Sequence, residues 1–154
     1  MILKLSDLMR YVIYESNDTK VPLSKQLEFL KSYVYLEQLR SGAGLKVEFD
    51  IRGPHTSTPV EPLLFIAFIE NAFKHGSRNP ERNPYIRILF DVERADQIVF
   101  TIENNHDPRD EEKKEGFGLL NVKKRLDLLY PGKYDLRTTD VDDIYRVTLT
   151  IEVV

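Results

Sequence analysis

Four polar residues near the middle of the chain have the types and spacing that could bind an ionic ligand: Glu70, Asn71, Lys74 and His75. The last three stand at positions i, i+3 and i+4, so they share one face of a helix. Residues 62–73 are otherwise mostly Leu, Phe, Ile and Ala, which is typical of a helix packed on a sheet. Burying a neutral polar group without a partner costs about 1–3 kcal/mol, and a charge costs more. The polar face therefore indicates a wet cavity or a charged ligand.

The same segment also fits a helix end that frays into solvent. Gly76 is a common residue just after a helix, and Lys74 and His75 suit the negative end of the helix dipole. The segment alone leaves both interpretations open.

A second segment could hold an anion. Gly116 and Gly118 lie just before a predicted helix that begins at Leu119. Glycine lets the backbone approach an anion closely, and a helix N-terminus offers free N–H groups. The charged run 110–115 before them is typical of a solvated loop. Together with the face at Asn71, the pattern predicts a metal or phosphate ligand on one helix, a phosphate cradle on another, and a mobile lid between them.

Composition excludes several kinds of site. The 154 residues include no cysteine, which excludes thiolate chemistry. Their net charge of −3 argues against nucleic acid as a partner. The three scattered histidines have no metal-ligand spacing, so zinc is not expected. No apolar run could span a bilayer and no signal-peptide layout begins the chain, so we expect a cytosolic domain, with any membrane anchor outside this chain.

Hydrophobic periodicity predicts the order helix, helix, strand, helix, strand, strand, helix, strand, strand. Helices are predicted at 3–15, from Pro22 to about 40, at 62–73 and at 119–130. Strands are predicted at 45–51, 86–92, 98–102, 134–138 and 145–153. Consecutive strands without crossover helices favour an α+β two-layer sandwich, with a mixed, mostly antiparallel sheet and helices on one face. The other face, with alternating charges, should contact solvent.

The motifs in this order resemble a known family. Residues 70–76, Glu-Asn-Ala-Phe-Lys-His-Gly, are similar to the N box of the GHKL ATPases, and more narrowly to that of the LytS-type sensor histidine kinases. Residues 116–130 resemble the second glycine box of that family and the helix that follows it. Residues 5–11 and 33–40 resemble its linker helices between the dimerisation and ATP-binding domains. The four matches cover nearly the whole chain.

The resemblance implies a Bergerat-type ATP-binding fold in residues 44–154, preceded by two linker helices in residues 1–43. It implies that the chain binds ATP and Mg²⁺, with Asn71 as the metal ligand and with Lys74 and His75 on phosphate oxygens. Such a site fits phosphoryl transfer, which depends mainly on positioning and on neutralising the phosphate charge.

The resemblance also implies roles for residues outside the N box. Gly116 and Gly118 would form the hinge of the lid, and N–H groups near Leu119 and Asn121 would meet the phosphates. Glu70 would polarise the nucleophile or a metal-bound water, or would only pair with Lys74 one turn later, and both alternatives stay open.

Two motifs depart from the family pattern. The adenine motif Asp-Asn-Gly-x-Gly corresponds to Asn-Asn-His-Asp-Pro at residues 104–108, so Asn104 takes the Asp position, and His106 and Pro108 replace the glycines. An Asn oxygen can still accept a hydrogen bond from the adenine amino group. A final Gly-Thr motif is missing, and residues 144–145 are Ile-Tyr instead. We expect weaker or altered nucleotide binding, with a Kd between about 1 µM and 1 mM, or about −8 to −4 kcal/mol.

The phosphoacceptor histidine of the family lies in a Pro-His-Phe-Leu-Phe-Asn-type helix that this sequence lacks. The chain is therefore predicted to be the ATP-binding catalytic domain of a sensor histidine kinase that phosphorylates a histidine outside this chain. The resemblance implies a membrane-anchored, homodimeric parent whose dimerisation helices and response regulator are the partners. One alternative is a degenerate, non-catalytic module for dimerisation and signalling. A kinase that phosphorylates serine on a partner protein ranks lowest.

Overall fold

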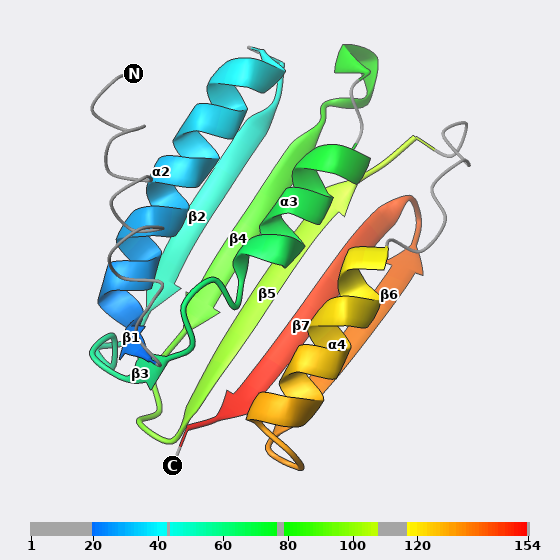
Figure 1. Ribbon diagram of the computed structural model, residues 1–154. Coiled ribbons are helices and arrows are strands. Elements are labelled where there is room, and N and C mark those ends of the chain that lie inside the picture. The colour runs from blue at the N-terminus through cyan, green and yellow to red at the C-terminus, as the bar shows by residue number, and fades with distance from the viewer. Residues whose placement is uncertain (1–19, 43, 77–78, 108–116, 154) are drawn as a thin grey trace.

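The computed structural model describes residues 20–42, 44–76, 79–107 and 117–153. In these ranges the chain forms an α+β sandwich in which three helices cover one face of a five-stranded sheet, as Figure 1 shows. The predicted fold class is confirmed. The first predicted helix (3–15), Gly116 and nearly all of the predicted lid lie outside the described residues.

The elements follow one another in an order close to the predicted one. They are β1 (Val21–Pro22), α2 (Leu23–Ser41), β2 (Lys46–Arg52), β3 (Pro59–Val60), α3 (Ile66–His75), the 3₁₀ helix η2 (Pro80–Arg82), β4 (Tyr85–Asp91), β5 (Gln97–Asn105), α4 (Phe117–Leu129), β6 (Tyr134–Val141) and β7 (Ile144–Glu152). The large sheet has the strand order β2-β4-β5-β7-β6. β2 pairs parallel with β4, and the other neighbours are antiparallel. The parallel pair arises because the chain crosses over through α3.

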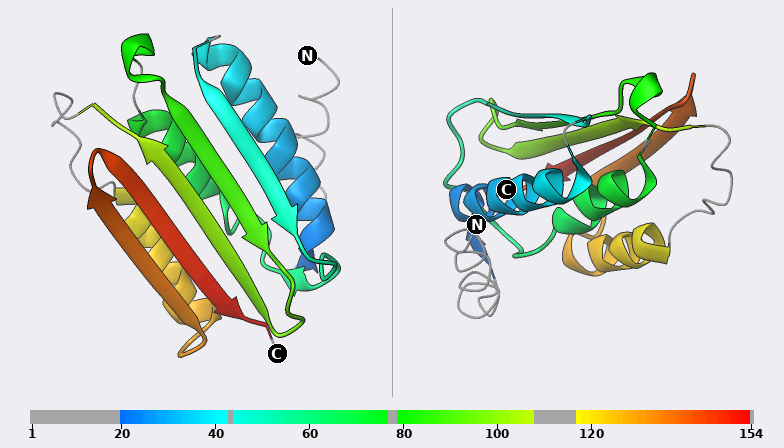
Figure 2. Two further views of the ribbon diagram at one scale, coloured as in Figure 1. Left: turned by 180° about the vertical axis from the view of Figure 1, so that it is seen from behind. Right: turned by 90° about the horizontal axis from the view of Figure 1, so that it is seen from above.

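Each strand of the large sheet presents its two faces to different environments. In β4 and β5, Ile88 and Phe100 are fully buried under the helices. The opposite face carries charge, with Arg87 bonded to Glu48 at 2.9 Å and to Glu103 at 3.2 Å. The view from above in Figure 2 shows that α2, α3 and α4 all lie on one face of the sheet. The charged, uncovered face is therefore as expected from the alternation of residues.

The core is one cluster shared by all three helices and the sheet. Four phenylalanine rings form its centre: Phe65, Phe68, Phe90 and Phe100. α2 contributes Leu23 and Leu30, both fully buried. α2 therefore belongs to the helical layer of the sandwich, while the division of the chain between residues 43 and 44 stays a prediction. No helix in the described ranges is long and apolar enough to cross a membrane.

Two local features differ from the sequence analysis. β1 and β3 pair as a small antiparallel sheet, at positions where the sequence predicts no strand. Backbone carbonyls of the segment just before β3 cap α2, because the N–H groups of Leu23 and Ser24 donate to the carbonyls of Thr58 and Thr56 at 2.9 and 2.7 Å. Ser24 is thus inside the first turn, and no side chain caps the helix. Backbone carbonyls accept the hydrogen bonds of the N–H groups at the start of α2 instead.

α3 also begins later than predicted. The apolar run starts at Pro62, but the helix starts at Ile66. Leu63 has φ +61°, a left-handed backbone that no helix tolerates. The residues before Ile66 therefore form a turn that delivers Leu64 and Phe65 to the core.

Candidate functional site

A small cleft lies where α3, α4 and the ends of β5 and β7 meet. It has a volume of about 10 Å³. Its walls are formed by Phe68, Asn71, Ala72, Ile102, Asn104, Leu119, Tyr145 and Val147. Three residues predicted for the site from separate motifs, Asn71, Asn104 and Leu119, thus come together in one place. Figure 1 shows the two helices side by side over the sheet at this point.

The polar walls of the cleft are two side-chain amides. Asn71 is half-buried, and its side chain makes no hydrogen bond to any residue of the described ranges. Asn104 is 3% exposed, and its Nδ2 donates to the carbonyl of Asn105 at 3.2 Å. That bond leaves Oδ1 of Asn104 as an acceptor, the arrangement that suits a ligand with an amino group.

Gly76 ends α3 and lies next to this cleft. Its N–H donates to the carbonyl of Ala72 at 2.9 Å, and its φ of −66° is accessible to any residue. Close approach explains the glycine instead. A Cβ at position 76 would lie 2.7 Å from the Ala72 oxygen and 3.6 Å from Nδ2 of Asn104. The helix end is thus packed against the amide wall of the cleft.

We therefore expect Gly76→Ala to destabilise the chain by about 1–2 kcal/mol, because the backbone must shift to relieve the contact. The shift relieves the clash with the Ala72 oxygen and takes place beside Asn104, so any binding of ATP in the cleft, measured by calorimetry, should weaken as well. Gly132→Ala is the control. Gly132 has φ +69° and no atom within 4 Å of the added Cβ, so only stability should fall, by about 1 kcal/mol. Equal effects of both changes on ATP affinity would contradict the role of Gly76.

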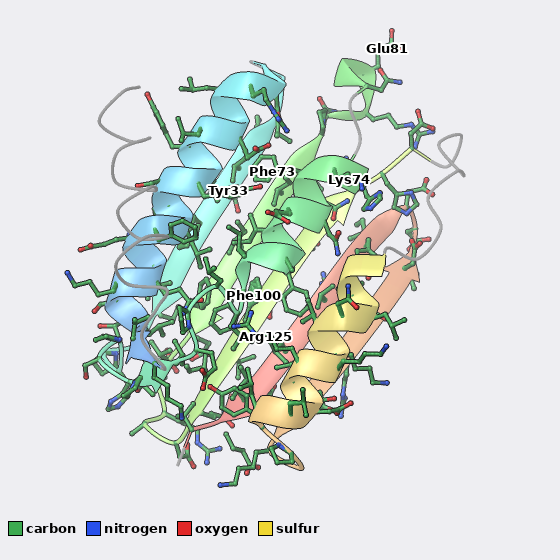
Figure 3. The ribbon with its side chains drawn as sticks, viewed as in Figure 1. Tyr33, Phe73, Lys74, Glu81, Phe100 and Arg125 are labelled. Atoms are coloured by element: carbon green, nitrogen blue, oxygen red, sulfur yellow. The ribbon has the colours of Figure 1, made fainter. Side chains whose placement is uncertain are left out.

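The charged residues of α3 lie around the cleft and not in its walls. Lys74 is exposed at the C-terminal end of α3, as Figure 3 shows, and His75 is half-buried beside it. Glu70 is exposed and forms no ion pair with Lys74, although both residues are described. Glu70 instead lies near Tyr33 of α2, whose pKa is raised first by burial and then by neighbouring carboxylates, including that of Glu70. The structure therefore does not contain the ion pair between Glu70 and Lys74 that the sequence left open.

The second glycine box is divided by the start of α4. Gly118 and Leu119 lie in its first turn, where backbone N–H groups lack partners within the helix. Leu119 lines the cleft, whereas Asn121 is exposed and is not part of the lining.

Sequence reasoning missed the apolar walls and Tyr145. Tyr145 stands directly opposite Asn104 in the pairing of β5 with β7, so both side chains lie on the helix-covered face. The signal in the sequence was the Ile-Tyr pair at the position of the missing Gly-Thr motif. Its link to Asn104 depends on a strand register that no local pattern specifies.

Arg125 connects α4 to the turn before α3 by hydrogen bonds. Its Nη2 donates to the carbonyl of Pro62 at 2.9 Å, and its Nη1 donates to that of Leu63 at 3.4 Å. Figure 3 shows Arg125 reaching from α4 toward the centre of the helical layer. Both acceptors belong to the segment in which Leu63 has a left-handed backbone, so the guanidinium also satisfies the carbonyls of a strained turn.

Arg125→Ala should therefore destabilise the chain by about 1–2 kcal/mol in urea unfolding, because two carbonyls lose a charged donor. Lys124→Ala, at the neighbouring exposed position, should change the free energy of unfolding by less than about 0.5 kcal/mol. Similar effects of the two changes would show that Arg125 does not hold α4 in place.

The cleft offers few oxygen donors for a Mg²⁺ ion. In the described ranges no group of three or more His, Asp or Glu side chains could hold a metal ion. Mg²⁺ bound with a nucleotide needs only one or two protein oxygens, because phosphates and waters supply the rest. The unbonded amide oxygen of Asn71 fits that requirement.

Comparison with known proteins finds related sequences and, separately, solved structures with the same fold. The family described as histidine kinase matches residues 1–45. The sensor histidine kinase YpdA of Escherichia coli is 30% identical over 140 residues, which cover 84% of this chain and 24% of that protein. The sensor protein LytS of Enterococcus faecalis is 27% identical over 142 residues, which cover 84% of this chain and 24% of that protein. The chain thus spans about a quarter of the length of the curated relatives it matches.

Solved structures share the fold. The nucleotide-free catalytic domain of the histidine kinase ThkA superposes with a TM-score of 0.64 at 14% identity and covers 88% of this chain and 96% of that domain. ThkA in complex with the response regulator TrrA superposes with a TM-score of 0.57, also at 14% identity, over 99% of this chain and 48% of that one. The chain is thus related over most of its length to sensor histidine kinases of the LytS and YpdA kind, and it has the fold of a histidine kinase catalytic domain.

Proposed function

We propose that this chain is the ATP-binding catalytic domain of a two-component sensor histidine kinase. The observation that carries the proposal is the convergence of Asn71, Asn104 and Leu119, from α3, β5 and α4, on a single cleft. Each comes from a different motif of the family resemblance, and nothing in their sequence separation requires them to meet.

In this function the cleft divides into a base end and a phosphate end. Oδ1 of Asn104 accepts a hydrogen bond from the adenine amino group, while Asn71 provides an oxygen ligand for Mg²⁺. Lys74 and His75, at the end of α3, face the phosphates together with the N–H groups in the first turn of α4. Bound Mg²⁺ would neutralise phosphate charge during transfer of the γ-phosphate.

The cleft has to widen for this to occur. Its volume of about 10 Å³ is enough for one water molecule, whereas sites for drug-sized ligands occupy about 300–1,000 Å³. α3 is held to the sheet by the phenylalanine cluster, so widening requires α4 to move away from it. Arg125, near the far end of α4, would serve as the fixed point of that movement.

The acceptor and partners lie outside this chain. We infer that the γ-phosphate passes to a histidine on dimerisation helices of the longer protein, where Glu70 polarises the acceptor, and then to a response regulator. The parent would be a homodimer anchored in the membrane, with this domain on the cytoplasmic side. The relationship to LytS-type sensors supports this placement.

The decisive experiment is titration of the chain with ATP in the presence and absence of Mg²⁺. We expect saturable binding with a Kd between about 1 µM and 1 mM that requires the metal. Addition of the acceptor helices and γ-labelled ATP should then produce acid-labile phosphohistidine. Absence of binding at millimolar ATP would refute the proposal.

A non-catalytic module remains the second candidate, because His106 and Pro108 replace the glycines of the adenine motif. Such a module would bind nucleotide without forming phosphohistidine when the acceptor helices are supplied.

A further inference from the structure

His106 makes a contact that reaches across an entire strand. Its Nε2 lies 2.8 Å from Oδ1 of Asp140 on β6. An ionised carboxylate only accepts hydrogen bonds, so Nε2 carries the proton that is donated. His106 directly follows β5, and β7 lies between β5 and β6. The hydrogen bond therefore spans the first residues of β7.

The contact lies on the face of the sheet that forms the cleft. Strand pairing places Asn104 of β5, Tyr145 of β7 and Asp140 of β6 in one row across three strands. Two members of this row, Asn104 and Tyr145, line the cleft. The third is the acceptor for His106, whose imidazole is only 21% exposed. The His106–Asp140 hydrogen bond thus restrains both ends of the row.

The tip of the β6–β7 hairpin is held in the same region. The backbone N–H of His106 donates to the carbonyl of Asp143 at 2.9 Å. Asp142 and Asp143 both have positive φ, which gives the hairpin a tight two-residue turn. Arg82 of η2 lies 3.4 Å from the Asp143 carboxylate. The end of β5 and the hairpin tip are therefore joined by a backbone bond and a side-chain bond, both from His106.

We propose that the His106–Asp140 hydrogen bond positions the base-binding end of the cleft. This inference rests on the proposed function, and His106 acts as a positioning residue that fixes the floor formed by Asn104 and Tyr145. A glycine at position 106 would leave that floor unrestrained on the β5 side. The phosphate end, at Asn71 and Lys74, lies on α3 and does not depend on this contact.

The test compares two ligands on the full 154-residue chain: MgATP, which occupies both ends, and magnesium tripolyphosphate, which lacks the base. His106→Ala and Asp140→Ala should each weaken MgATP binding about fivefold and leave tripolyphosphate binding unchanged. The double variant should bind MgATP no more weakly than either single variant, because both changes break one interaction. His106→Gln, which keeps a donor at similar reach, should restore most of the affinity.

Asp135→Ala is the matched control. Asp135 lies on the same strand as Asp140 but on the open face, where it bonds Arg137 at 2.8 Å. Its removal should leave the binding of both ligands unchanged. Thermal unfolding of each variant identifies a general loss of structure, and Asp140→Ala carries the test if His106→Ala fails to fold.

The possible failures can be told apart. Equal weakening of MgATP and tripolyphosphate would show that the contact only supports the fold and would overturn the inference. Unchanged MgATP binding in both single variants, with binding by the unaltered chain, would overturn the inference and leave the proposed function standing. Absence of MgATP binding by the unaltered chain would overturn both.

Discussion

Replacing Asn71 by alanine should weaken the binding of MgATP at least about a hundredfold, or about 2.7 kcal/mol. Asn71 is the one side-chain oxygen in the cleft wall on α3, and it makes no hydrogen bond to the described residues. Its loss therefore removes an oxygen ligand without disrupting an internal contact. The free energy of unfolding should change by less than about 1 kcal/mol. Isothermal titration calorimetry and urea unfolding measure the two quantities separately.

The metal dependence of this effect provides its strongest control. With excess EDTA the unaltered chain should bind ATP about as weakly as Asn71→Ala does, and EDTA should have little further effect on the variant. Asn121→Ala is a second control, because Asn121 is exposed and alanine keeps its backbone N–H. Full MgATP affinity in Asn71→Ala would remove Asn71 from the metal site.

The sandwich could be predicted because each large element has its own local signal. Alternation in residues such as Val47, Phe49 and Ile51 marks β2, and the structure places that strand within one residue of the prediction. Pro131 and Gly132 likewise mark the end of α4. β1 and β3 have two residues each, which is too short for any period to appear.

The site was only partly predictable, for a related reason. Asn71 and Leu119 belong to motifs that lie on or at the start of a single helix, so each motif can be recognised from local sequence. The partners of Asn104 and His106, which are Tyr145 and Asp140, lie 41 and 34 residues away along the sequence and meet them only through the order β5-β7-β6. Long-range register of this kind is a property of the whole sheet. The departure of residues 104–108 from the adenine motif therefore becomes interpretable only with the fold in hand.

The position of Asn71 depends in turn on how α3 is held to the sheet. Phe100 of β5 is fully buried, and its ring centre lies 5.1 Å from that of Phe65, 5.7 Å from that of Phe68 and 4.9 Å from that of Phe90. Phe68 also lines the cleft, three residues before Asn71. The cluster thus connects the centre of the sheet directly to the wall that carries the amide.

Phe100→Ala should accordingly lower the free energy of unfolding by about 3–5 kcal/mol, since it removes a fully buried ring and leaves a cavity. Domains of this kind are stabilised by only about 5–15 kcal/mol, so the variant should unfold at much lower urea concentration or not fold cooperatively. Val99→Ala, at the neighbouring position on the open face, should cost less than about 1.5 kcal/mol.

Phe100→Leu keeps the protein folded and tests the link to the site. Leucine fills most of the volume, so the expected loss is about 1–2 kcal/mol, but it cannot make the edge contacts with Phe65 and Phe68. α3 should then be less firmly fixed, and MgATP affinity should fall more in Phe100→Leu than in Val99→Ala. If Phe100→Ala and Val99→Ala were equally stable, the aromatic cluster would not be the attachment of α3, and the position of Asn71 would need another cause.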